Sequence, residues 1–138
     1  MKILVFGAGV LGCNLARNLF RAGKDVTLLA RGSWAEEIRK NGLRIKDKFS
    51  PRMSLSRIPV VTELKPEDAY DVIFVVLRYT QLDTIMEPLR ANPAKNIVFV
   101  GNNVRTRALP PRCRRKTCCL PLCPRQDTGN ATMWHPST

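Results

Sequence analysis

The amino-acid sequence predicts an α/β fold in which helices cover an open sheet of parallel strands. The first observation is a set of continuous apolar runs rich in branched side chains, at residues 2–6, 25–30, 72–77 and 97–100. Such runs are typical of parallel strands buried on both faces. The second is a helical repeat between the first two runs, which makes a strand–helix–strand unit of the usual length. The third is a glycine cluster where the first strand ends.

That cluster is the hexapeptide Gly7-Ala8-Gly9-Val10-Leu11-Gly12, a G-x-G-x-x-G pattern. In this pattern Gly7 makes the tight turn, Gly9 lets the backbone approach a pyrophosphate, and Gly12 lets helix and strand pack closely. The amides that follow lie at the positive end of a helix, where they bind phosphate. The pattern predicts a Rossmann-type dinucleotide site formed by these six residues, although a glycine turn without a ligand is the alternative.

The helix after the turn is predicted from spacing. Leu11, Leu15 and Leu19 repeat at i, i+4 and form one apolar stripe, with Gly12, Ala16 and Phe20 beside them. Arg17 is expected on the polar side. Gly23 stands where a glycine commonly ends a helix.

Arg31 follows the second predicted strand, where NAD-binding sites place an Asp or Glu to hold the ribose 2′-hydroxyl. No carboxylate occurs at Ala30, Arg31 or Gly32. A guanidinium is instead a forked, charge-assisted partner for a 2′-phosphate. NADP is therefore favoured over NAD, the alternative being an ordinary surface arginine at a strand end.

The next segments predict smaller elements. Ser33 is expected to cap a second helix, with the capping-box spacing to Glu36. Residues 43–53 suggest a small antiparallel hairpin. Pro59 argues that the segment after it forms an edge strand.

Two later strands end at polar residues. The strand at 72–77 leads to Arg78 and Gln81, and the strand at 97–100 leads to Asn102. The carboxyl ends of parallel strands face the ligand crevice in a doubly wound sheet, so these side chains are candidate cofactor contacts. We expect the crevice at the ends of the first and fourth strands. For Arg78 and Gln81 the alternative is a solvated helix N-terminus.

Charge and hydropathy limit the other functions. The net charge is +12, but residues 1–104 hold 16 Lys+Arg against 10 Asp+Glu, and residues 105–138 hold 7 against 1. Half of the excess therefore lies in the last quarter of the chain, and the basic residues before it are too scattered to predict nucleic-acid binding. No signal peptide or membrane span is visible, so a cytoplasmic protein is expected. Cys13 is interpreted as a small buried residue.

Residues 1–104 resemble the N-terminal NADP-binding domain of the ketopantoate reductases, also called 2-dehydropantoate 2-reductases. The resemblance rests on four places: Gly7/Gly9/Gly12, Arg31, the V-V-L-Arg78-x-x-Gln81 strand end, and Asn102. It implies that Arg31 contacts the 2′-phosphate of NADP and that Asn102 lies beside the nicotinamide and the substrate. The family usually has lysine in place of Arg78 and glycine in place of Asn103.

The resemblance also implies the parent activity, which is NADPH-dependent reduction of the keto acid ketopantoate to pantoate in pantothenate biosynthesis. The family carries its catalytic lysine in a later helical domain, so no catalytic residue is expected in these 138 residues, and the chain is expected to be inactive by itself. An NADP-binding module or sensor without catalysis is the alternative. The oligomeric state is left open.

The sequence changes character after Val104. Residues 105–138 hold five of the ten prolines and four of the five cysteines, with few branched aliphatic residues, so a basic tail of low order is expected. Truncated or out-of-frame sequence is the favoured interpretation. Zinc binding by the cysteines is disfavoured because the C-x₂-C pairs of structural sites are missing, so no metal site is predicted. Nucleic-acid or anionic-lipid binding by the arginines is a further alternative.

Overall fold

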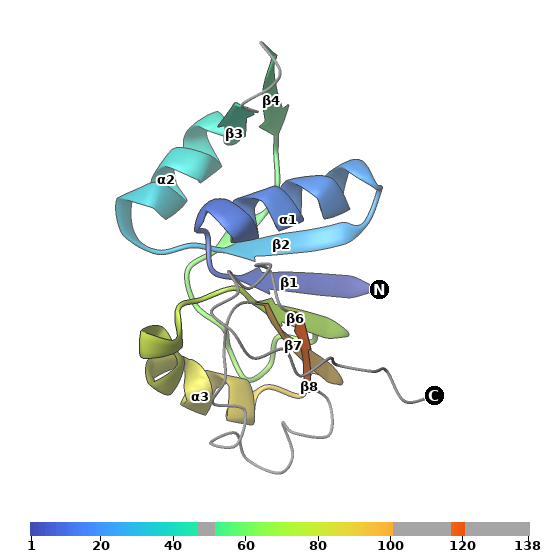
Figure 1. The fold of residues 1–138 in the computed structure, drawn as a ribbon, viewed down its shortest axis with the longest axis vertical. Helices are drawn as coiled ribbons and strands as arrows, with labels where there is room; N and C mark the ends of the chain where they lie inside the picture. Colours follow the sequence, from blue (N-terminus) through green and yellow to red (C-terminus); the bar gives the residue numbers. More distant parts are fainter. Residues whose placement is uncertain (47–51, 101–116, 121–138) are drawn as a thin grey trace, which may run out of the picture.

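The computed structural model describes residues 1–46, 52–100 and 117–120. Its main sheet runs through the middle of the molecule, with α1 and α2 lying along one side and α3 on the other (Figure 1). The strands of this sheet are β1 (Lys2–Phe6), β2 (Asp25–Leu29), β5 (Val60–Val61), β6 (Val72–Val75), β7 (Asn96–Val100) and β8 (Thr117–Leu120). The helices are α1 (Val10–Arg21), α2 (Gly32–Asn41), the short 3₁₀ turn η1 (Tyr79–Gln81) and α3 (Leu82–Ala91).

The strand order is β5-β2-β1-β6-β7-β8, and each neighbouring pair is parallel. The chain winds outward from β1 through β2 to β5, and then returns to place β6 on the other side of β1. This is the predicted doubly wound order. Its direction reverses between β1 and β6, which are the first and fourth strands of this sheet in chain order. Ligands of such sheets bind outside the carboxyl ends of the two strands at the reversal.

Alternate residues of β1 enter different cores, which explains its unbroken apolar run. Ile3 and Val5 pack with α1, α2 and β3 on one face, whereas Leu4 and Phe6 pack with α3 on the other. All four side chains are buried. A parallel strand with both faces covered needs apolar residues at every position, as the sequence predicted.

β7 is not the edge of the sheet, because β8 pairs with it. Ile97 pairs with Thr117 and Val100 with Leu120, so β8 covers the outer edge of β7. β8 lies within the segment expected to have low order, and the expectation of a low-order tail stays a prediction. The remainder of 105–138 lies outside the described residues, and the boundary at residue 104 stays a prediction.

α1 presents only part of the expected apolar stripe to the sheet. Gly12, Cys13 and Ala16 are buried, whereas Leu11 is 49% exposed. Small residues face the strands because they let the helix approach closely, and the larger leucines lie beside them. Arg17, predicted on the polar side, is also buried, and its Nη1 donates to Ser54 Oγ at 3.3 Å.

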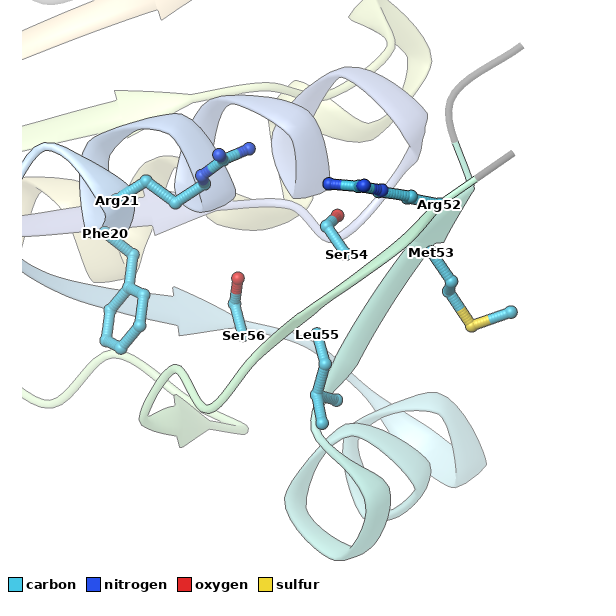
Figure 2. A pocket seen from close by; sticks show the side chains of 7 residues that line it. All are labelled: Phe20, Arg21, Arg52, Met53, Ser54, Leu55 and Ser56. Carbon is cyan, nitrogen blue, oxygen red and sulfur yellow. The ribbon is translucent and has the colours of Figure 1, made fainter. Parts of the chain in front are cut away.

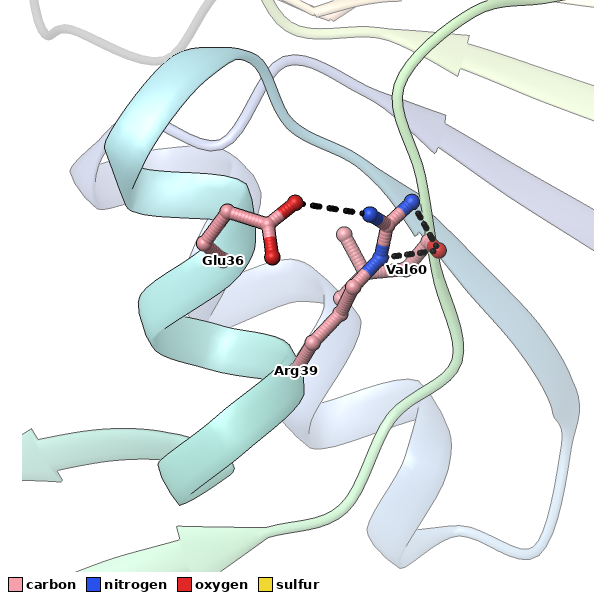
Figure 3. A network of polar contacts seen from close by, with 3 residues as sticks. All are labelled: Glu36, Arg39 and Val60. Carbon is pink, nitrogen blue, oxygen red and sulfur yellow. Dashed lines mark hydrogen bonds and ion pairs between the residues drawn. The ribbon is translucent and has the colours of Figure 1, made fainter.

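α2 begins at Gly32 with Arg31 as its N-cap, and no side chain caps it, so the predicted cap at Ser33 is wrong. The helix is held at the sheet by Arg39 (Figure 3). The guanidinium of Arg39 pairs with Glu36 at 3.0 Å and donates to the Val60 carbonyl oxygen from Nε and Nη2, at 3.4 and 3.3 Å. Arg39 therefore fixes α2 to β5, which is the edge strand that Pro59 predicted.

The predicted hairpin is present as a separate antiparallel sheet of β3 (Leu43–Lys46) and β4 (Met53–Ser56). β4 and the C-terminal end of α1 border a hollow of about 480 Å³ (Figure 2). It is lined by Phe20, Arg21, Arg52, Met53, Ser54, Leu55 and Ser56. A 12-residue helix is about 18 Å long, so this hollow lies far from the glycine turn at the other end of α1.

Candidate cofactor site

The glycine turn connects β1 to α1 at the carboxyl edge of the sheet. Gly7 has φ +118°, and a Cβ there would collide with the carbonyl oxygen of Val76, just after β6. A Cβ on Gly12 would collide with the carbonyl oxygen of Gly7. Both glycines are therefore required by backbone packing, as the pattern predicted. Gly7 and Gly12 shape the turn whether or not a ligand is present.

Gly9 differs from its two neighbours because nothing lies within 4 Å of a Cβ built on it. Its φ of −78° is open to any residue, so neither backbone strain nor protein packing calls for glycine at this position. The open space next to the backbone is suited to a ligand that approaches closely. A pyrophosphate fits this observation.

Gly9 is also the N-cap of α1, and the first turn of the helix is exposed. Val10 is 81% and Leu11 49% exposed, and no acidic residue occupies this turn. The free N–H groups and the positive end of the helix dipole therefore meet no negative side chain of this turn. An anion is the ligand that this helix end favours.

The Ala8 carbonyl oxygen is held by two side chains. Trp34 Nε1 in α2 donates to it at 3.1 Å, and Cys13 Sγ in α1 donates at 3.4 Å. Burial raises the pKa of the Cys13 thiol, although a hydrogen bond with Trp34 acts in the opposite direction. The thiol therefore keeps its proton at neutral pH and remains a donor. No pattern in the sequence marks Trp34 for this contact, because the two residues are 26 positions apart.

Arg31 lies between the end of β2 and the start of α2, with its side chain exposed. Its guanidinium carbon lies over the Phe6 ring, 5.9 Å from the ring centre. Phe6 is the last residue of β1, directly before Gly7. This cation–π contact places the Arg31 charge beside the beginning of the glycine turn.

Arg78 and Gln81 follow β6, the strand next to β1 at the reversal of the sheet. Both side chains are exposed, and the Gln81 N–H donates to the Arg78 carbonyl oxygen at 2.9 Å. Gln81 is also the N-cap of α3. The structure thus places these residues on the expected side of the sheet, without a fixed contact to the turn. Asn102 lies outside the described residues.

The part of the chain that the structure describes lacks two other features. No helix there is both long and apolar enough to cross a membrane. Within the same residues, no cluster of three or more His, Cys, Asp or Glu side chains has the arrangement of a metal site. The tail residues of the zinc alternative are outside these ranges or have no described side chains.

A glycine turn at the carboxyl end of the first strand, in a parallel sheet of this order, defines a Rossmann-like domain of the oxidoreductase type. The family model of the ketopantoate reductases PanE/ApbA matches residues 3–120. The chain belongs to this family, whose members are NAD(P)-dependent oxidoreductases. The match extends beyond residue 104 and includes β8.

Individual proteins agree with this assignment. The chain is 35% identical over 92 residues to a 2-dehydropantoate 2-reductase of Mesorhizobium japonicum, covering 64% of this chain and 27% of the relative. It is 32% identical over 98 residues to that of Pyrococcus horikoshii, covering 71% and 30%. The chain thus spans about a third of the length of these relatives.

Solved structures show the same fold. The 2-dehydropantoate 2-reductase of Porphyromonas gingivalis superposes with a TM-score of 0.66 at 26% identity, covering 80% of this chain and 43% of that protein. A D-mandelate dehydrogenase solved with NADH and anilino(oxo)acetate gives a TM-score of 0.63 at 24% identity, covering 72% and 33%. The second likeness concerns the fold alone.

Proposed function

We propose that this chain supplies the NADPH-binding domain of an oxidoreductase that reduces ketopantoate to pantoate. The observation that carries the proposal is the pairing of an open, anion-favouring turn at Gly9 with a cation at Arg31, joined through Phe6. A dinucleotide with a 2′-phosphate has anionic groups for both places. The pyrophosphate would meet the amides of the turn, and the 2′-phosphate would meet Arg31.

The preference for NADPH over NADH depends on Arg31 and not on the fold. The D-mandelate dehydrogenase of similar fold was solved with NADH, so the fold alone does not select NADPH. Arg31 is exposed, and its contact with Phe6 leaves the guanidinium N–H groups available for a phosphate. Further contacts, in the half of the cofactor opposite the 2′-phosphate, are proposed for Arg78, Gln81 and Asn102.

The test is a titration of the purified chain with NADPH and with NADH, followed by the fluorescence of the reduced nicotinamide. Arg31→Ala should weaken NADPH about ten- to hundredfold, because a charge-assisted hydrogen bond contributes about 1.5–3 kcal/mol. The affinity for NADH should change less than twofold. Equal weakening of both nucleotides would contradict the assignment of the 2′-phosphate to Arg31.

The chemistry of the reduction sets a second expectation. NADPH supplies the hydride when bound, and the alkoxide that forms on the substrate must receive a proton. None of the described residues at the glycine turn or at Arg31 is assigned as the proton donor, and general acid catalysis is worth about 10²–10⁴-fold. We therefore propose that this polypeptide binds NADPH without appreciable turnover of ketopantoate. Substrate-dependent oxidation of NADPH, abolished by Arg31→Ala, would contradict this and would also exclude a non-catalytic module.

A further inference from the structure

Trp34 joins two parts of the candidate site that are distant in the sequence. It lies in the first turn of α2, three residues after Arg31, and its indole N–H donates to the carbonyl oxygen of Ala8 inside the glycine turn. The side chain is 44% exposed, so burial in a core does not explain its position. Its most specific contact is this hydrogen bond.

The bond determines the orientation of one peptide group. Ala8 and Gly9 share a trans peptide, in which the carbonyl oxygen and the next N–H point in opposite directions. Trp34 and Cys13 hold the Ala8 oxygen toward the helices. The Gly9 N–H is therefore directed the other way, on the residue whose surroundings are open.

The same bond is one of two contacts that set the separation between the turn and Arg31. Two contacts link the start of α2 to the β1–α1 connection, namely Arg31 over Phe6 and Trp34 to Ala8. α2 is fixed at its other end by Arg39, which donates to the Val60 carbonyl oxygen. The beginning of α2 is thus held against the turn, and the helix cannot shift without breaking one of these contacts.

We propose that Trp34 is a positioning residue that orients the Ala8–Gly9 peptide and keeps the glycine turn in register with Arg31. This inference rests on the proposed NADPH function. A dinucleotide that contacts the turn and Arg31 at once binds more tightly when the distance between them is fixed, because the turn does not then have to become ordered on binding. A small ligand that engages Arg31 alone does not depend on the turn.

The test compares NADPH with adenosine 2′-monophosphate, which carries the 2′-phosphate without the pyrophosphate. In the full chain, Trp34→Phe keeps an aromatic ring and removes the donor. A neutral hydrogen bond contributes about 0.5–1.5 kcal/mol, so NADPH should bind about three- to tenfold more weakly. Binding of adenosine 2′-monophosphate, followed by ligand-observed NMR, should change less than twofold. A general structural role would weaken both ligands by the same factor.

Two further variants sharpen the result. Trp34→Gln loses the ring but keeps a side-chain N–H donor, and it should bind NADPH within about twofold of the wild type. Glu37→Gln changes an exposed position on the same helix, keeps an acceptor for Asn41, and serves as the matched control. If Trp34→Phe does not fold, Trp34→Gln is decisive, and a tenfold loss of NADPH affinity in that variant overturns the proposal.

The outcomes separate this inference from the function on which it rests. A wild-type chain that binds no NADPH refutes the proposed function. A wild-type chain that binds NADPH through Arg31, together with a Trp34→Phe variant that binds NADPH equally well, refutes the role of Trp34 alone.

Discussion

The connections that leave β1 and β6 occupy the same edge of the sheet but are built differently. The turn after β1 is packed on both sides, because Gly7 lies against the Val76 carbonyl and Gly12 against the Gly7 carbonyl. The segment after β6 instead carries Arg78 and Gln81 in solvent. The first connection is shaped by packing within the protein, whereas the polar side chains of the second lie in solvent. We infer that the turn sets the position of the cofactor and the second segment adjusts to it.

The largest expected effect is at Gly9, the open position of the packed turn. Gly9→Val should reduce NADPH affinity by about a hundredfold or more, because the side chain fills the space beside two or more phosphate-binding amides. Stability should fall by only about 1 kcal/mol, from the poorer N-cap. Titration and urea unfolding measure the two effects, and retained NADPH binding would refute the phosphate turn.

Gly12 should show the reverse behaviour. The methyl group of Gly12→Ala would collide with the backbone of Gly7, and such overpacking lowers the free energy of unfolding by about 1–3 kcal/mol or more. The greater helix propensity of alanine offsets about 1 kcal/mol of this loss. We expect a net loss of about 2 kcal/mol in urea unfolding. Gly9→Ser is the control, since serine is a good N-cap and meets no neighbour, and it should change stability by less than about 0.5 kcal/mol. Equal stability of the Gly12→Ala variant and the wild type would show that the turn is less rigid than its packing indicates.

Arg78 tests the second connection. Because its side chain is exposed, Arg78→Ala should leave the unfolding free energy within about 0.5 kcal/mol. An exposed ion pair contributes about 0.2–1 kcal/mol, so NADPH affinity should fall about two- to fivefold at most. A loss as large as that of Arg31→Ala would mean that the segment after β6 provides the main phosphate contact.

The smallest effect concerns pH and the Cys13 donor under the turn. Burial raises the pKa of this thiol in the folded state, so the unfolded chain loses its proton first as pH rises. The thiol makes its full contribution to the free energy of unfolding below the unfolded-state pKa of about 8.5, and that contribution declines at higher pH. Cys13→Ala should flatten the fall in stability between about pH 8.5 and 10, measured by urea unfolding. An unchanged slope would show that the thiol contributes nothing to it.

Much of the site could be predicted because its signals are local. Gly12 is required by its contact with the Gly7 carbonyl, and Gly7 by its contact with the Val76 carbonyl just after the neighbouring strand β6. Arg31 is marked by its place after an apolar strand. The parallel strands were recognisable because burial on both faces leaves an unbroken apolar run, as in β1. β1 has the expected ends, and β2, β6 and β7 each differ from the expected ranges by one or two residues at one end.

Most of the failures concern contacts between segments that are distant along the chain. Arg17 was expected in solvent, but the hairpin of β3 and β4 covers it and supplies Ser54 as a partner. One failure is local: Ser33 had the spacing of a helix cap, but the N-cap of α2 is Arg31, two residues earlier. β8 was missed because its short segment stands among residues without a periodic pattern.

The sequence by itself determined the class of fold, the glycine turn and the cation after β2, because these depend on backbone sterics and on residues adjacent in the chain. Only the tertiary structure decided that Arg17 of α1 is buried, which strand covers β7, and that Trp34 reaches Ala8. The physical reason is that a side-chain hydrogen bond or an edge pairing depends on how whole elements pack. That packing balances many weak contacts, and no short stretch of sequence records it.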